Sequence, residues 1–218
     1  MSSELLRLAE VMDQLRSPGG CPWDAEQTHH SLLKYLLEES YEFVDAVDQN
    51  DRQSMREELG DILLQVYFHS RIAQEDKEDP FSIEDVAKEI ADKLIRRHPH
   101  VFADAEINSS DELLQNWERL KAEEKGRNSA TDGVALSQPA LPLITKLIYR
   151  AEKNGIDISH KIELPSSDLN NDVLDEQKIG DVLVAAIAAA IKLGIEPEDL
   201  LRARAREISD EIKRIETL

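Results

Sequence analysis

Five acidic side chains stand within two otherwise apolar helical patterns between Tyr35 and Phe68. They are Glu38, Glu39, Glu42, Glu58 and Asp61. Glu39 and Glu42 lie one helical turn apart and can point at the same place, and Glu58 and Asp61 form a second pair of the same spacing. Carboxylate oxygens suit Mg²⁺ or Mn²⁺, whereas a zinc site would call for His or Cys. The pattern therefore favours a divalent metal site over a merely solvated acidic face.

The helix that carries Asp61 has apolar residues on two faces. Leu64 and Phe68 follow Asp61 in its own row, at i+3 and i+7, where a solvated face would have no reason to carry them. We therefore expect the acidic face to be covered by another helix or by a second subunit. Covered carboxylates that lie close together cannot all stay ionised without a cation. The two main apolar stripes are Leu33, Leu36, Leu37, Val44 and Val47 on the first helix, and Leu59, Ile62, Leu63, Val66, Ser70 and Ala73 on the second.

The elements that position these acids are all helices. Gly, Pro and aromatic residues are scarce, and apolar residues recur with helical spacing, which predicts an all-α helical bundle. Ser82 followed by Asp85 indicates a helix start, and Pro99 indicates where that helix ends. The five expected helices of the first part are Ser3–Leu15, Ser31–Val47, Arg52–Gln74, Ile83–Arg97 and Ser110–Lys125.

The charge of the chain limits its partners. Its 218 residues carry a net charge of −19, which argues against binding nucleic acid or an anionic membrane, since both require a basic surface. An anionic small molecule would need metal ions or a local basic cluster. The single cysteine, the charged amphipathic N-terminus and the lack of a long apolar run together favour a soluble, cytoplasmic protein.

The second half of the chain contains an incomplete echo of the first. In both halves a Gly-Asp pair opens an apolar helix, and a turn, an Asp and a helix with basic residues near its end follow. We expect a first domain over 1–126, a linker over 127–142 and a degenerate second copy over 143–218. Lys178 stands where the first copy has Glu58, and Asp181 has no acidic partner. The second copy is therefore expected to be non-catalytic.

Four ordered motifs carry a resemblance to a known family. "EESYE" followed by "EELGD" resembles the EExxE and ExxD signature of the all-α nucleoside triphosphate pyrophosphohydrolases, and more closely the MazG family. "GCPWDAEQT", "KLIRRHPHVF" and "WERLKAEEK" are similar to further stretches of that family. The resemblance implies Mg²⁺-dependent hydrolysis of nucleoside or deoxynucleoside triphosphates to monophosphate and pyrophosphate, for nucleotide-pool house-cleaning. It also implies a homodimer of helical bundles.

The resemblance assigns roles to particular residues. It makes Glu39, Glu42, Glu58 and Asp61 the metal ligands, and Glu38 an outer-shell group or the base for the attacking water. The cations Lys93, Arg96 and Arg97 share one helix face, and their clustering in so acidic a chain indicates a triphosphate clamp, with which the resemblance agrees. We expect loss of Arg97 to affect substrate binding more than stability. Trp117, with Lys121 in the same segment, would border the nucleotide, and Trp23, in a Gly- and Pro-containing loop, would close one side.

Two other functions remain open from the sequence. Di-iron proteins also build carboxylate clusters in helical bundles, but they need Glu-x-x-His pairs on two helices. Glu26 and His29 offer a single such spacing, before the apolar periodicity begins. A non-catalytic helical interaction module is the stronger alternative for the second half, which lacks the acidic set.

Overall fold

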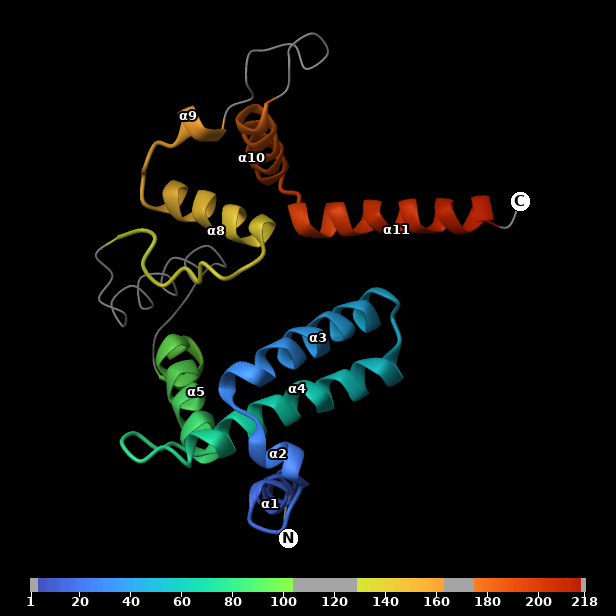
Figure 1. Ribbon diagram of the computed structural model, residues 1–218. Helices are drawn as coiled ribbons and strands as arrows, with labels where there is room; N and C mark the ends of the chain where they lie inside the picture. Colours follow the sequence, from blue (N-terminus) through green and yellow to red (C-terminus); the bar gives the residue numbers. More distant parts are fainter. Residues whose placement is uncertain (1–3, 104–128, 163–174, 217–218) are drawn as a thin grey trace. The chain divides into compact units, whose positions relative to one another are not determined.

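The computed structural model describes residues 4–103, 129–162 and 175–216, and these residues form helices and loops with no strand among them (Figure 1). The all-α prediction is therefore confirmed. The chain divides into two compact units, Met1–Trp117 and Glu118–Leu218. The helix expected over 110–125 and the domain boundary expected after residue 126 lie outside the described residues.

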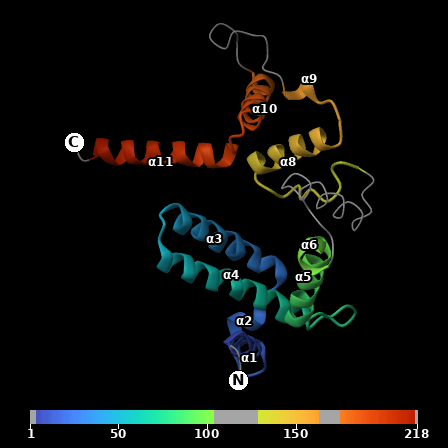
Figure 2. The same ribbon diagram turned by 180° about the vertical axis from the view of Figure 1, so that it is seen from behind.

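The first unit contains six helices within residues 4–103, and four of them match the expected ones to within about two residues. The helix bounds are α1 Glu4–Arg16, α2 Pro22–Glu26, α3 His29–Asp48, α4 Arg52–Ala73, α5 Ile83–Arg97 and α6 Pro99–Phe102, the last labelled in Figure 2. At the start of α5, the Ser82 side chain accepts from the Asp85 backbone N–H while Asp85 accepts from that of Ser82, a capping box.

The short helix α2 corrects the expected loop. Pro22 at its first position needs no N–H partner and has the backbone angle that a helix requires. The preceding turn depends on Gly20, because a Cβ there would come within 2.2 Å of the Gln14 carbonyl oxygen. A five-residue helix carries too little apolar periodicity to be seen in the sequence, and Trp23 therefore lies on a helix.

A tight turn joins α3 to α4 in an antiparallel hairpin. Asn50 has a φ of 55°, the left-handed conformation that commonly ends a helix. The Asp51 N–H donates to the Ala46 carbonyl and the Asn50 N–H to the Val47 carbonyl, both of which would otherwise lack a helical partner. The Asp51 side chain in turn accepts from the first backbone N–H groups of α4. The hairpin therefore pivots on Asn50.

The core of the first unit covers part of the row that begins at Asp61. Phe68 is 3% exposed and packs with Met12, Leu32 and Tyr67, and Leu64 packs against the same cluster. The expectation that this row is covered holds for its apolar members, and the cover comes from helices of the same unit.

The two predicted apolar stripes, by contrast, are partly uncovered. Leu37 is 57% exposed and Leu59 51%, and Leu33, Val47 and Val66 are also exposed. The buried residues on α3 are Leu32 and Ala46, both of which the predicted stripe omitted.

A buried arginine connects α1, α2 and α4. Arg16 is 8% exposed and donates to both carboxylate oxygens of Glu75, at 3.0 and 2.8 Å. Its Nη1 donates to the carbonyl oxygens of Asp24 and Gln27, at 2.6 and 3.1 Å, so it holds the end of α2. The guanidinium also lies 5.5 Å from the centre of the Phe68 ring.

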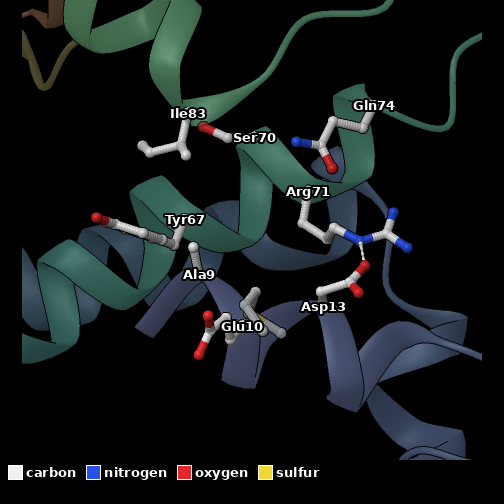
Figure 3. Close-up of a pocket in the computed structure, with 9 residues that line it drawn as sticks. Ala9, Glu10, Asp13, Tyr67, Ser70, Arg71, Gln74 and Ile83 are labelled. Carbon is white, nitrogen blue, oxygen red and sulfur yellow. Dashed lines mark hydrogen bonds and ion pairs between the residues drawn. The ribbon is translucent and has the colours of Figure 1, made fainter. Parts of the chain in front are cut away.

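A hollow lies beside this junction, between α1, α4 and the start of α5 (Figure 3). Within it Arg71 donates to Asp13 at 2.8 Å, and Arg71 also binds Glu75. None of the predicted site residues lines the hollow. Its lining residues are Ala9, Glu10, Met12, Asp13, Tyr67, Ser70, Arg71, Gln74 and Ile83.

The second unit has its own small core. Its helices within the described ranges are α8 Ala140–Lys153, α9 Ser159–Ile162, α10 Glu176–Lys192 and α11 Pro197–Glu216. Ile148, Ile187 and Ala188 form its buried centre. Helix α8 begins at Ala140, so its first three residues fall within the expected linker. Among the described residues, no helix combines the length and the apolar character that crossing a membrane requires.

Candidate metal centre

The hairpin brings the predicted acids together in opposing pairs. Glu39 lies eleven residues before Asn50 and Asp61 lies eleven after it, so an antiparallel pair of helices places them at the same level. Glu42 and Glu58, eight residues before and after the same pivot, form the second pair. The packing of α3 on α4 thus positions all four acids.

Three of these acids converge closely enough to hold one cation. Glu39, Glu58 and Asp61 each offer a carboxylate oxygen, and the three oxygens lie within 4.8 Å of one another. All three side chains are half-buried. Within the described residues this is the one such group of three or more potential ligands, and it contains neither His nor Cys. An all-carboxylate set of this kind fits a hard cation such as Mg²⁺.

The electrostatics of the cluster also fit a cation. Burial raises the pKa of Glu39 above its ordinary value, and neighbouring carboxylates raise it further, that of Asp61 most. Burial likewise raises the pKa of Glu58, with the charges of Glu42 and Asp61 adding to the effect. Each carboxylate is thus harder to ionise because of the others, and a bound cation would remove that repulsion.

Glu42 stands next to the three converging acids. A protonated Glu58 donates a hydrogen bond to Glu42, which is one reason for its raised pKa. Glu42 and Glu58 also line a shallow polar hollow at the turn end of the hairpin, together with Asp51 and Ser54. Glu42 therefore lies beside the converging group without being one of its three members.

Glu38 lies apart from the converging set. Its side chain is exposed and its carboxylate is not among the three that meet, although its charge contributes to the raised pKa of Glu39. The role of Glu38 as an outer-shell group or as the base for the attacking water therefore remains a prediction.

The predicted basic clamp lies on the last two turns of α5. Lys93 is half-buried and Arg96 is exposed. Arg97 is 9% exposed, which corrects the expectation that its loss costs little stability, because removing a buried side chain leaves a cavity. Arg96 is therefore the cleaner residue for testing the clamp.

Of the two tryptophans predicted to border the substrate, the structure describes Trp23 but not Trp117. Trp23 is 50% exposed on α2, and its ring meets the Tyr35 ring edge-on at 6.0 Å. Trp117 and Lys121 lie outside the described residues, so their predicted roles remain predictions.

Histidine is absent from the acidic cluster. His29, the second member of the Glu-x-x-His spacing, lies against His69 instead, with their Nδ1 atoms 2.8 Å apart and their rings stacked. Burial and the nearby His29 lower the pKa of His69. The di-iron alternative therefore gains no support from this histidine.

Comparison with known proteins identifies the family. Residues 27–102 match the MazG nucleotide pyrophosphohydrolase domain. The nucleoside triphosphate pyrophosphohydrolase/pyrophosphatase MazG of Thermotoga maritima is 39% identical over 222 residues, which cover 97% of this chain and 85% of the relative. The chain belongs to the MazG family.

Two further relatives also span almost the whole chain. The nucleoside triphosphate pyrophosphohydrolase of Escherichia coli K12 is 36% identical over 99% of this chain and 88% of its own. A 26.1 kDa protein from the blaB 3′ region of Streptomyces cacaoi is 45% identical over 98% of this chain and 83% of its own. The MazG match includes the four predicted metal ligands and the basic face of α5, whereas Trp23, Trp117 and Lys121 fall outside it.

Proposed function

We propose that this MazG-family protein hydrolyses nucleoside or deoxynucleoside triphosphates to the monophosphate and pyrophosphate, with Mg²⁺ as its cofactor and Mn²⁺ as a substitute. The observation that carries the proposal is the convergence of Glu39, Glu58 and Asp61 across the α3–α4 hairpin. A cytoplasmic enzyme of this kind would serve house-cleaning of the nucleotide pool.

In this proposal the chain's own residues divide the work. Glu39, Glu58 and Asp61 hold the ion, and Glu42 completes the set from its place beside Glu58. When bound, the ion supplies charge neutralisation for the polyphosphate and Lewis-acid activation of water. Exposed Glu38 accepts the proton of the attacking water as the bridge between the α and β phosphates breaks and pyrophosphate leaves.

Identifying which phosphate–phosphate bond the protein hydrolyses tests this function directly. The full-length protein should convert standard and deoxynucleoside triphosphates to monophosphate and pyrophosphate when Mg²⁺ is present, as followed by ion-exchange chromatography. A first product pair of diphosphate and orthophosphate would contradict the proposal. Screening all the bases in both sugar series would also reveal the substrate preference.

Arg96, an exposed member of the predicted clamp on α5, provides a second prediction. Arg96→Ala should raise the KM for triphosphate about tenfold, equivalent to roughly 1.4 kcal/mol, because a charge-assisted contact to phosphate is lost. Lys88→Ala on the same helix is the matched control, since Lys88 pairs with Asp92 at 2.6 Å and should not affect KM. An unchanged KM in Arg96→Ala would mean that the basic residues only complement the helix dipole.

The uncovered apolar residues of the first unit support a homodimer. Leu37, Tyr41 and Leu59 are each about half exposed or more, on the same two helices that carry the acids. Apolar side chains gathered in this way usually mark an association surface. In the proposed dimer a second copy covers this surface.

The second unit is proposed to have no catalytic role. Asp181 is exposed, and Lys178, one turn before it on α10, places a positive charge where the first unit has Glu58. A cation there repels Mg²⁺. Asp181→Ala should therefore keep wild-type turnover, measured beside a circular dichroism spectrum. Loss of turnover in a folded Asp181→Ala protein would show that this unit takes part in the chemistry.

A further inference from the structure

Helix α11 carries an apolar seam along its exposed side. Leu201, Ile208 and Ile215 recur every seven residues, and Ala205 and Ile212 fill the alternate positions between them. This is the a and d spacing of a coiled coil. Ile208 is 63% exposed, and Leu201, Ile212 and Ile215 are each more than half exposed. Three exposed isoleucines in one row are costly for an isolated helix, so the seam needs a partner surface.

The two ends of the seam differ in a way that limits what can cover it. At the N-terminal end, Leu200 and Leu201 line an almost wholly apolar groove with Leu183 and Ala186 of α10 and Ile144 of α8. At the C-terminal end, Ile212 and Ile215 belong to neither that groove nor the buried centre of the unit. An antiparallel second copy would place its C-terminal isoleucines beside this groove, at both ends of the pair. A parallel copy would instead place groove against groove.

The charges that flank the seam select one antiparallel register. In the register that sets Ala205 opposite Ile208 of the second copy, Arg204 lies beside Glu211 of that copy, and the twofold symmetry repeats the pair. A shift of one heptad in one direction places Arg204 beside Arg204 of the second copy. A shift in the other direction places Glu211 beside Glu211 of the second copy. Both shifts place like charges together on this side of the seam, whereas the first register pairs opposite charges there and sets Arg202 beside the uncharged Ser209 on the other side.

The same register also packs well and keeps the existing ion pairs. It sets the small Ala205 against the large Ile208, whereas a parallel pair would set alanine against alanine and leave a gap. Arg204 binds Glu207 at 2.6 Å within its helix, and Glu211 binds Arg214 at 2.6 Å. A guanidinium has five donors and a carboxylate about four acceptor sites, so each can also bind across the seam.

We propose that α11 forms an antiparallel two-helix coiled coil with α11 of a second copy of this chain, with Ala205 opposite Ile208. This contact is separate from the surface proposed on α3 and α4, so it would make the second unit an assembly element. It does not rest on the proposed catalytic function.

Cysteine cross-linking of the full-length chain tests the register. The native Cys21, the single cysteine of the chain, is first changed to Ser. Ala205→Cys and Ile208→Cys chains are then co-expressed with different tags and oxidised at low micromolar concentration. We expect most of the mixed protein to run as a covalent dimer carrying both tags on a non-reducing gel. Each variant alone should cross-link poorly, because its own copies are offset by three residues, about 4.5 Å along the axis.

A matched control distinguishes the seam from chance collision. Ala203→Cys and Asp210→Cys have the same axial offset but lie on the outer side of the helix, so that mixture should give little covalent dimer. Adding Arg204→Glu to both chains should lower the cross-linked fraction severalfold, and adding Glu211→Arg as well should restore it. Cross-linking no greater than in the outer pair, or as strong in Ala205→Cys alone, would overturn the proposal. Triphosphate hydrolysis measured on the same proteins reports separately on the proposed function.

Discussion

Asp61→Asn is expected to lower kcat/KM for triphosphate hydrolysis by roughly 100-fold or more, because the amide keeps the shape of the side chain but loses the charge that holds a metal. Asp61 is one of three acids whose oxygens meet within 4.8 Å, and it faces Glu39 across the hairpin. Pyrophosphate release at several Mg²⁺ concentrations is the measurement. The Mg²⁺ concentration needed for half-maximal activity should rise sharply in the variant.

A neighbouring acid supplies the control for this substitution. Glu57→Gln removes the same charge from the same helix, next to Glu58 but outside the converging group. It should keep activity within about twofold of wild type, since Glu57 adds to the raised pKa of Glu58 through its charge but contributes no oxygen to the converging group. Wild-type turnover in Asp61→Asn would contradict the ligand assignment.

Asp61→Asn should also change the stability of the protein in a pH-dependent way when metal is absent. The folded-state pKa of Glu39 is raised, so the folded protein holds that proton more tightly than the unfolded chain, whose value is about 4.5. Carboxylate repulsion therefore lowers stability above the folded pKa and is relieved as the pH falls through it towards 4.5. Without metal, Asp61→Asn should melt above wild type at neutral pH, and this gain should fade in acid.

Arg16→Met should produce the largest loss of stability in the first unit, about 3 kcal/mol. Methionine can replace the apolar stem of Arg16 but not its bonds to Glu75 and to the Asp24 and Gln27 carbonyls. Urea unfolding followed by Trp23 fluorescence in a Trp117→Phe background would measure the loss where it occurs, because Trp23 lies on the helix that Arg16 holds.

An exposed arginine on the same helix provides the comparison. Within the described part of the chain Arg7 pairs with Glu4, one turn away. Both side chains are largely exposed, so Arg7→Met should cost less than about 0.5 kcal/mol. Equal losses in the two variants would contradict the structural role of Arg16.

Part of the Arg16 effect should depend on pH. Its hydrogen bonds lower the pKa of Glu75, so this pair adds stability above the unfolded value of about 4.5. That contribution is lost as the pH falls through the lower folded value, so the difference between wild type and Arg16→Met should narrow in acid. The part of the stability difference that comes from the hydrogen bonds to the Asp24 and Gln27 carbonyls should remain in acid.

Local signals in the sequence predicted the helices well. Ser82, Asp85 and Pro99 define both ends of α5, and its predicted bounds match the structure. Prediction failed where contacts between distant parts of the chain determine which side chains are paired or buried. Arg16 and Glu75 are 59 residues apart, and nothing in their local sequence indicates that they meet. The burial of Leu32, and not of Leu33 or Leu37, likewise follows from where α1 packs on the hairpin, which helical periodicity cannot specify.

For the candidate site too, local spacing was predictable from the sequence and tertiary contacts were not. The spacing within each helix identified Glu39 with Glu42 and Glu58 with Asp61, but their pairing across the helices depends on the turn at Asn50. Equal distances from the "DQND" turn are a signal that could have predicted the pairing. The sequence predicts a loop at Trp23, because α2 is too short to show helical periodicity. The burial of Arg97 could not be predicted, because Leu94, Ile95 and Arg96, which directly precede it on α5, are all exposed.

Metal binding by the full-length chain without nucleotide is the most direct test of the central claim, that the α3–α4 hairpin holds a divalent cation. Mn²⁺ serves as the probe, because its electron paramagnetic resonance signal decreases when it leaves free solution. Wild type and Glu57→Gln should bind Mn²⁺ alike, and excess Mg²⁺ should displace it. Glu39→Gln and Asp61→Asn should each weaken the binding at least about tenfold. Equal affinity in all four proteins would contradict the assignment of the metal centre to these acids.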